Sequence, residues 1–331
     1  MSLLKKLAFA AALAAVTLSV PAAMAQTKIA LVVKSLGNGF FDAANKGAQE
    51  AAAEIGGIEV IYTGPTTASA EGQIEIINSL IAQNVNAIAI SANDADALVP
   101  VLKKAMERGI VVISFDSGVA PEGRMMQLNA SGTQLIGDTI IKMAADQLPD
   151  GGDVAILSAS STATNQNAWI EAAKASLPTK FPKINLVDVV YGDDDSVKST
   201  NEAKGLIAKY PNLKAIIAPT TVGVVAAAQV VTDMGLIGKV NVVGLALPSE
   251  FKQFIDNGSS TAAALWNPID LGYSAIQIAS QLVNKTAEAK PGATISIGRV
   301  GSITLDDNLS ADMAPPFEFN KSNIEEFSKI Y

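Results

Sequence analysis

The feature that most constrains the fold is the stretch of residues 28–55, where a short apolar run gives way to a helical pattern. The residues from Ile29 to Val33 are continuously apolar, and the run stops at Lys34. An unbroken apolar run is typical of a strand covered on both faces, as in a parallel sheet. After a polar turn, apolar residues recur on one helical face, at Phe41, Ala44, Ala48, Ala52 and Ile55. This switch of period predicts the start of a βαβ unit.

The same alternation of strands and helices continues along the chain in two successive series of roughly 110–130 residues, each the size of an ordinary domain. We therefore expect an α/β protein with two similar doubly wound parallel-sheet lobes. The expected N-terminal lobe comprises residues 26–128 plus 265–304, and the C-terminal lobe comprises 129–264 plus 305–331. Crossing strands between two such lobes would form a hinge rather than a flexible tether.

Residues 1–25 have the pattern of a secretory signal peptide. A basic Lys5-Lys6 pair precedes an almost wholly apolar run, and Ala23-Met24-Ala25 is a small-x-small cleavage site. We expect cleavage after Ala25 and no membrane insertion once the signal is removed. The alternative, a membrane anchor, is disfavoured because the apolar run is short for a membrane span.

The composition excludes several classes of enzyme. The 331 residues include no cysteine and no histidine, which rules out disulfides, thiol nucleophiles, Ser/His/Asp triads and the usual zinc sites. A net charge of −8 without a long basic block argues against nucleic acid or an anionic membrane as a partner. No cofactor and no metal are expected.

Two motifs resemble a cofactor site and a metal site but lack residues that such sites need. The turn Gly37-Asn38-Gly39 lacks the third glycine of a dinucleotide fingerprint, because Asp42 occupies that position. The acidic run of residues 193–195 lacks the full spacing of a calcium-binding loop. We interpret this run as a solvated loop.

Polar and aromatic residues gather where the predicted strands end. Lys34, Ser91 and Asp116 each follow a strand directly, and the pair Phe40 and Phe41 follows the first turn. Ligands in open α/β sheets bind beyond the carboxyl ends of the strands, so these side chains are candidate ligand contacts. Structural interpretations stay open: a solvated lysine at Lys34, a turn cap at Asp116 and a core ring at Phe41.

Five long segments carry a resemblance to a known family: GFFDAANKGAQEAA, YTGPTTASAEGQ, ISANDADALVP, IIAPTTVGVVAAA and LWNPIDLGYSA. The chain after the signal resembles the type I periplasmic binding proteins of ABC transporters, and within them rhamnose-binding proteins and receptors for the quorum signal autoinducer-2. The resemblance implies a periplasmic protein, not an enzyme. It would capture a small sugar ligand between its lobes and deliver it to an ABC transporter permease.

The resemblance also implies a set of ligand-binding residues. Four residues match positions of the autoinducer-2 receptors that hold ligand, namely Lys34, Asp116, Gln166 and Pro219. Two positions depart from that pattern, because Asn165 stands where those receptors have aspartate and Thr221 where they have alanine. An amide in place of a carboxylate removes a charge and an acceptor but adds a donor. This departure favours the rhamnose-binding branch.

The chain departs from the ribose-type pattern as well. Those sites are rich in Arg and Asp that bond sugar hydroxyls in bidentate fashion, whereas the turn of residues 244–247 carries no carboxylate and Trp266 replaces a glutamine. A pocket with fewer charges and an added aromatic should prefer a ligand with an apolar face, such as the 6-deoxyhexose rhamnose. Asn267 completes the expected set. Trp266 has an equally good interpretation as hinge packing.

Alternative functions stay open. The protein could be an autoinducer-2 receptor for uptake or chemotaxis, and its closed form could dock a chemoreceptor as well as a permease. A secreted hydrolase or isomerase would need paired carboxylates, and Asp94, Asp96 and Asp116 are not demonstrably paired. A sugar-responsive repressor is disfavoured by the export signal and by the lack of an N-terminal helix-turn-helix motif.

Overall fold

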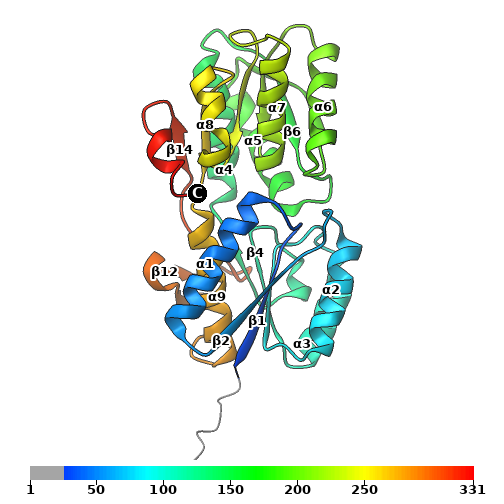
Figure 1. The fold of residues 1–331 in the computed structure, drawn as a ribbon, viewed down its shortest axis with the longest axis vertical. Coiled ribbons are helices and arrows are strands. Elements are labelled where there is room, and N and C mark those ends of the chain that lie inside the picture. The colour runs from blue at the N-terminus through cyan, green and yellow to red at the C-terminus, as the bar shows by residue number, and fades with distance from the viewer. Residues whose placement is uncertain (1–25) are drawn as a thin grey trace, which may run out of the picture.

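A computed structural model describes residues 26–331, which form two α/β lobes stacked along the long axis of the molecule (Figure 1). Each lobe contains a six-stranded sheet with helices on both faces. The predicted fold class, two similar doubly wound lobes, is confirmed. The predicted signal peptide lies outside the described residues.

The first sheet has the strand order β13-β5-β4-β3-β1-β2, and all of its strands are parallel. These strands are β1 (Thr27–Val32), β2 (Ile58–Thr63), β3 (Ala87–Ile90), β4 (Val111–Phe115), β5 (Met126–Asn129) and β13 (Ser310–Asp312). The helices of this lobe are α1 (Gly39–Ile55), α2 (Ala70–Ala82), α3 (Val99–Glu107) and α9 (Pro268–Val283).

The second sheet repeats this topology with the order β14-β10-β9-β8-β6-β7, and only the edge strand β14 is antiparallel to its neighbour. Its strands are β6 (Gly152–Ser158), β7 (Ile184–Tyr191), β8 (Leu213–Ala218), β9 (Asn241–Leu245), β10 (Ser260–Leu265) and β14 (Phe317–Asn320). Its helices are α4 (Thr133–Gln147), α5 (Thr164–Lys180), α6 (Ser196–Lys209), α7 (Thr221–Asp233), α8 (Pro248–Asn257) and the short α10 (Ile324–Phe327). A small separate hairpin consists of β11 (Thr294–Ser296) and β12 (Ser302–Thr304).

The continuous apolar run of β1 is explained by two separate cores. Ile29, Leu31 and Val33 belong to the core that contains α1 and α9, whereas Ala30 and Val32 face the core beneath α2 and α3. Successive side chains of a strand point to opposite faces, so a sheet covered twice needs apolar residues at every position. The expected helical face of α1 is buried as well, except for Ile55, which is 36% exposed because the helix ends there.

The chain crosses between the lobes after β5, after β10 and after β13. The expected boundary at residue 304 is wrong for one strand. It assigned residues 310–312 to the C-terminal lobe, whereas β13 pairs with β5 in the first sheet, and the chain reaches the second sheet only at β14. A strand of three residues with a single apolar side chain inside carries too little pattern to reveal which sheet it joins.

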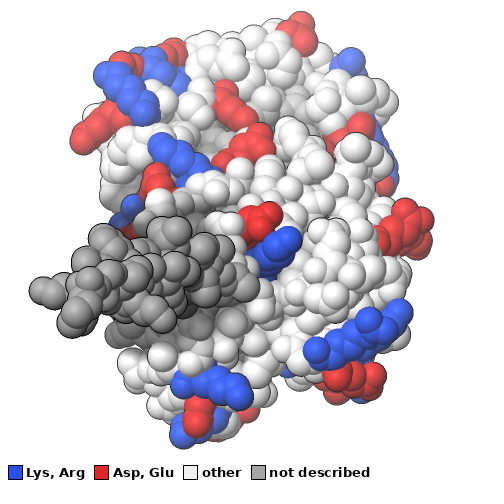
Figure 2. Space-filling view, turned by 60° about the horizontal axis from the view of Figure 1, so that its bottom comes forward, with Lys and Arg blue, Asp and Glu red and all other residues white. Residues whose placement is uncertain are grey.

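On the face shown in Figure 2, positive and negative side chains lie in small mixed groups, without a large patch of one sign. Among residues 26–331, no helix combines the length and the apolar character needed to cross a bilayer.

Helices α1 and α9 pack so closely that their contact requires glycine. A Cβ added at Gly47 would lie 1.7 Å from the carbonyl oxygen of Ile269, and one at Gly272 would lie 1.8 Å from that of Ala44. Because α9 follows the second crossing and α1 follows β1, this contact ties the recrossing chain to the first lobe (Figure 1).

We therefore expect Gly47→Ala to lower the free energy of unfolding by about 1–3 kcal/mol, the usual cost of overpacking. The measurement is urea unfolding followed by circular dichroism. Gly205→Ala is the matched control, because Gly205 lies inside α6 with nothing within 4 Å of an added Cβ. There the substitution should stabilise the protein by roughly 0.5–1 kcal/mol. Equal effects at the two positions would contradict the packing argument.

Candidate functional site

A small cavity of about 40 Å³ lies between the two lobes, where the carboxyl ends of both sheets face each other. We call it the cleft cavity. The first lobe contributes Lys34, Asn38, Phe40, Phe41 and Asp116 to its wall. The second lobe and its crossing contribute Gln166, Trp169, Asp194, Pro219, Thr220, Thr221, Leu245, Leu265 and Trp266. Half of the wall is therefore polar and half is apolar.

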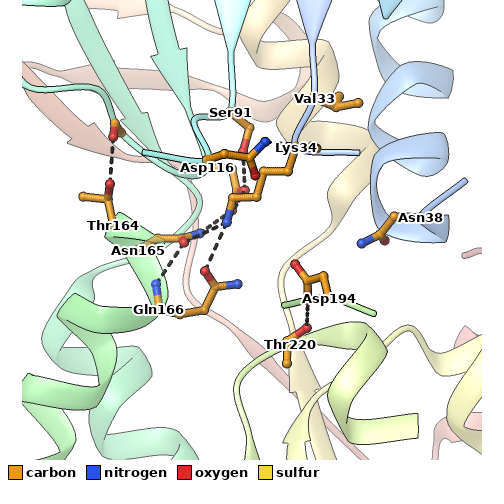
Figure 3. A network of polar contacts seen from close by, with 12 residues as sticks. Val33, Lys34, Asn38, Ser91, Asp116, Thr164, Asn165, Gln166, Asp194 and Thr220 are labelled. Atoms are coloured by element: carbon orange, nitrogen blue, oxygen red, sulfur yellow. Dashed lines mark hydrogen bonds and ion pairs between the residues drawn. The ribbon is translucent and has the colours of Figure 1, made fainter. Parts of the chain in front are cut away.

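Lys34 connects the lobes directly. Its side chain is buried, and Nζ donates hydrogen bonds of 3.1 Å to Asn165 Oδ1 and of 3.1 Å to Gln166 Oε1 across the cleft (Figure 3). The same Nζ lies 4.0 Å from Asp116 Oδ2. A buried ammonium group needs such partners, because burial without them carries a large desolvation cost.

Asp116 is held from both lobes. Ser91 Oγ donates to Asp116 Oδ2 at 2.7 Å, and Asn165 Nδ2 donates to Oδ1 at 2.8 Å. Burial raises the pKa of Asp116 above its ordinary range, although Lys34, Ser91 and Asn165 act in the opposite direction. Its backbone has a φ of +56°, a conformation that non-glycine residues adopt at an energetic cost and that tends to occur at functional sites.

An aromatic cluster forms the apolar part of the wall. Phe40 packs edge-on against Phe41 and Trp266, with ring centroids 5.2 Å and 6.1 Å apart, and Trp169 lies 5.5 Å from Trp266. Trp266 Nε1 is buried and has no hydrogen-bond partner among the described residues. A buried donor in this state costs stability unless a ligand or water satisfies it.

The second lobe places a carboxylate at the cavity that the sequence analysis did not assign to it. Asp194 bonds Thr220 Oγ1 and lines the cavity, whereas residues 193–195 were interpreted as a solvated loop. That interpretation is wrong for Asp194, which is half-buried, although Asp193 and Asp195 are exposed. The available signal was its position: Asp194 follows β7 as Lys34 follows β1.

The remaining expected residues take different positions. Ser91 and Asn165 do not line the cleft cavity itself but bond the carboxylate that does. Asn267 caps α9, where its Oδ1 accepts from the backbone N–H of Ile269 at 2.9 Å. Its contact with a ligand therefore stays a prediction, as do the ligand contacts of the other expected residues. Besides Asp194, the wall residues missed by sequence reasoning are Asn38, Trp169, Thr220, Leu245 and Leu265.

Further hydrogen bonds hold the lobes together beside the cavity. Thr162 Oγ1 donates to the carbonyl of Asn93 at 2.8 Å, and Thr164 Oγ1 donates to that of Gly118 at 3.0 Å. Because donor and acceptor belong to different lobes in each pair, the structure represents a closed arrangement. No group of three or more acidic side chains suited to a metal ion occurs in residues 26–331.

Two repeated sheets, crossing segments and a cleft lined from both sides define a two-lobe solute-binding protein. Residues 29–287 match the family model of the periplasmic binding protein domain, and the chain belongs to this family. This membership confirms the expectation of a binding protein rather than an enzyme.

Curated relatives and solved structures agree with this assignment. The chain is 30% identical to the D-ribose/D-allose-binding protein of Pseudomonas aeruginosa over 248 residues, which is 72% of this chain and 76% of the relative. It is 26% identical to the D-allose-binding periplasmic protein of Escherichia coli, over 87% of this chain and 92% of the relative.

Several similar structures contain a ligand, and two of them bear on the expected one. An ABC transporter solute-binding protein from Clostridium phytofermentas with bound L-rhamnose is 40% identical, with a TM-score of 0.88 over 92% of this chain and 99% of that one. LsrB from Clostridium saccharobutylicum in complex with AI-2 is 25% identical, with a TM-score of 0.86 over 91% and 99% of the two chains.

The two tryptophans of the chain, Trp169 and Trp266, both line the cleft cavity, so intrinsic fluorescence reports on this site. Asn165→Ala removes the cross-lobe bonds to Lys34 and Asp116, each worth about 1.5–3 kcal/mol because a charged group takes part. We expect this variant to be more open and its emission to shift to longer wavelength. X-ray scattering should show a larger radius of gyration.

The matched control is Asn167→Ala in the same helix. Within residues 26–331, the Asn167 side chain bonds only the carbonyl of Ser161 in its own lobe, at 2.8 Å, so its loss should leave the emission unchanged. An unshifted spectrum in the Asn165 variant would show that its bonds do not hold the lobes closed.

Proposed function

We propose that this protein captures a small sugar between its lobes in the periplasm and delivers it to the permease of an ABC transporter. The family assignment and the sugar-binding relatives support this function. The observation that carries it is the cleft cavity, whose polar groups come from both lobes. Within this family-level function, we propose L-rhamnose as the preferred ligand.

Sugar hydroxyls would take over the bonds that now join the lobes directly. Lys34 and the amide of Gln166 donate to hydroxyl oxygens, and the carboxylates of Asp116 and Asp194 accept from hydroxyl hydrogens. The cleft cavity of about 40 Å³ is too small for a pyranose while Lys34 bonds Asn165 and Gln166. The ligand would therefore separate these side chains and bridge the lobes in their place. Because both lobes contact it only when closed, the ligand shifts the population toward the closed form.

The apolar half of the wall favours a deoxy sugar. The rings of Phe40 and Phe41 and the side chain of Leu265 offer no partner for an additional hydroxyl, but they can cover a methyl group. The unpartnered Trp266 Nε1 would donate to a ring or hydroxyl oxygen of the same ligand. The similarity to a structure with bound L-rhamnose supports the same choice.

Three sugars that differ only at C6 test this proposal. L-Rhamnose carries a methyl group there, L-lyxose lacks the carbon, and L-mannose carries a hydroxymethyl group. In isothermal titration we expect L-lyxose to bind about fourfold more weakly, since one buried carbon is lost. L-Mannose should bind at least about fivefold more weakly, because a hydroxyl is buried without a partner.

L-Mannose binding as tightly as L-rhamnose would contradict apolar recognition of C6. Binding of autoinducer-2 without binding of any of these sugars would favour the alternative, a receptor for quorum-signal uptake or chemotaxis, which the similarity to LsrB supports. A pull-down with permease and chemoreceptor domains, with and without ligand, separates transport from signalling.

Asp116 gives the binding a pH dependence of definite sign. A hydroxyl that donates to its carboxylate favours the ionised form, so affinity should fall as the pH decreases through the pKa of Asp116 in the free protein. Because burial raises that pKa, the loss should begin at a higher pH than for an ordinary carboxylate. Titrations between pH 7 and pH 4 measure the effect.

Asp116→Asn should weaken sugar binding at pH 7 by about 10-fold to 100-fold and remove the acid dependence. Asp146→Asn, on the exposed face of α4, serves as the control and should retain both. An unchanged acid dependence in the Asp116 variant would show that another group titrates.

A further inference from the structure

The backbone that carries Lys34 and Ser91 lies beyond the last paired residues of two neighbouring strands. β1 and β3 are parallel neighbours, and their pairing ends at Val32 and Ile90. The carbonyl groups of Val33, Lys34 and Ser91 therefore have no partner in the strand ladder, although all three residues are buried. A buried carbonyl without a hydrogen bond costs stability, so these groups need donors from elsewhere.

Gln73, near the start of α2, supplies two of the donors. Its side chain is fully buried, and its Nε2 donates to the carbonyl of Val33 at 3.0 Å and to that of Ser91 at 2.7 Å. Its Oε1 accepts from the backbone N–H of Asn93 at 2.9 Å. A primary amide has two N–H donors and one acceptor oxygen, and here each of the three forms a bond. One side chain therefore fixes the segments after β1 and β3 relative to each other.

Asn93 supplies the third donor. Its Nδ2 donates to the carbonyl of Lys34 at 2.9 Å and to that of Ser69, the cap of α2, at 3.2 Å. The carbonyl groups before and after the Lys34 side chain are thus bonded by Gln73 and Asn93 respectively. The backbone of Lys34 cannot move without breaking a buried hydrogen bond, although neither amide lines the cleft cavity.

The side chains supported in this way form the cross-lobe contacts of the cleft. Lys34 Nζ reaches two acceptors of the second lobe at 3.1 Å, and Ser91 Oγ bonds Asp116 at 2.7 Å (Figure 3). A contact of about 3.6 Å no longer counts as a hydrogen bond. A backbone shift of roughly 1 Å at Lys34 or Ser91 would therefore remove these bonds.

The segment after β3 also meets the second lobe directly. The carbonyl of Asn93 accepts from Thr162 Oγ1 at 2.8 Å, whereas its N–H donates to Gln73. The backbone of Asn93 is therefore held between α2 and the second lobe. The support of Lys34 and this cross-lobe contact depend on the same two amides.

We propose that Gln73 and Asn93 are positioning residues, which hold Lys34 and Ser91 in the geometry that bonds the second lobe and the sugar. The part that concerns sugar rests on the proposed function of the cleft cavity, whereas the part that concerns closure does not. Substitution of either amide weakens both closure and sugar binding, although neither side chain belongs to the cavity wall.

Gln73→Met tests the closure without sugar. Methionine has a similar length but no amide, so the carbonyls of Val33 and Ser91 lose their donors. At a temperature at which the variant is folded, we expect tryptophan emission to shift to longer wavelength and the radius of gyration to increase, as for Asn165→Ala. A lower melting temperature with unchanged emission would reduce Gln73 to a structural role and overturn the proposal.

Gln277→Met is the matched control. Gln277 is also a buried glutamine of the first lobe, but its Nε2 bonds Tyr273 Oη at 3.0 Å and it does not line the cleft cavity. Its loss should lower stability and leave the emission unchanged. An equal emission shift in both glutamine variants would indicate general loosening and would overturn the assignment of Gln73.

Asn93→Ala keeps the test valid if Gln73→Met fails to fold. It removes the donor to the carbonyl of Lys34 and leaves the backbone bonds of position 93 in place, so its emission should shift in the same direction. Asn86→Ala is matched to it, because Asn86 bonds the N–H of Lys28 at the opposite end of β1, at 2.8 Å. An emission shift that is the same in both asparagine variants would exclude Asn93 from the positioning role.

Sugar binding gives a second measurement. In isothermal titration with L-rhamnose, or with the sugar that the C6 series identifies, Gln73→Met should bind about 10-fold to 100-fold more weakly, because the contact groups are misplaced. Gln277→Met should bind as the wild type does. Equal affinities of the wild type and Gln73→Met would overturn the positioning role in sugar binding.

The pH profile of binding separates positioning from general destabilisation. Burial and the charge of Asp194 raise the pKa of Asp116, whereas Lys34, Ser91 and Asn165 lower it. With Ser91 displaced, the pKa of Asp116 in the free protein rises further, so the loss of affinity on acidification should begin at a higher pH than in the wild type. An unchanged profile would show that Ser91 keeps its position and would contradict the proposal.

The two proposals fail in different ways. The emission measurement uses no sugar, so a wild-type protein that binds none of the tested sugars would overturn the proposed ligand and leave the positioning role in closure standing. A wild-type protein that binds L-rhamnose, together with unchanged emission and affinity in Gln73→Met and Asn93→Ala, would overturn the positioning role alone.

Discussion

The closed arrangement of this protein depends on the way its buried ammonium group is satisfied. Lys34 extends from the first lobe, but both of its hydrogen-bond acceptors, Asn165 and Gln166, belong to the second. A buried charge needs partners, and here the partners arrive only when the lobes close. The same atoms that bond each other across the cleft are those that sugar hydroxyls would satisfy. The same polar side chains therefore serve both the closure of the lobes and the recognition of the ligand.

The duplication of topology explains why the site has two similar halves. Each sheet reverses its strand order between its first and third strands, and ligands of open α/β sheets bind at such a point. Stacking two lobes with their carboxyl edges facing brings two such points together. The first lobe contributes Lys34 and Asp116 to the cleft cavity, and the second lobe contributes Asp194 and Thr220.

Much of the fold was predictable from the sequence, because double burial leaves a continuous apolar run and helices leave a period near 3.6. The same logic located Lys34 and Asp116, since a polar residue directly after such a run lies at the ligand edge of the sheet. Gly192 and Asp193 separate Asp194 from the end of β7, and its acidic neighbours suggested solvent. The position of Trp169 at the cavity could not be predicted in this way, because the sequence of a helix does not indicate which of its rings faces the other lobe. The three-residue β13 was missed for lack of pattern.

Residues 310–320 provide an edge strand for each of the two sheets. The two short strands, β13 and β14, form the outermost strand of the first and second sheets respectively. Until residues 310–320 are in place, β5 and β10 present open edges with unpaired backbone groups, a recognised route to association between chains. Neither lobe can therefore finish its sheet before residues 310–320 are in place. Because one segment closes the edges of both sheets, the completion of one lobe is coupled to the completion of the other.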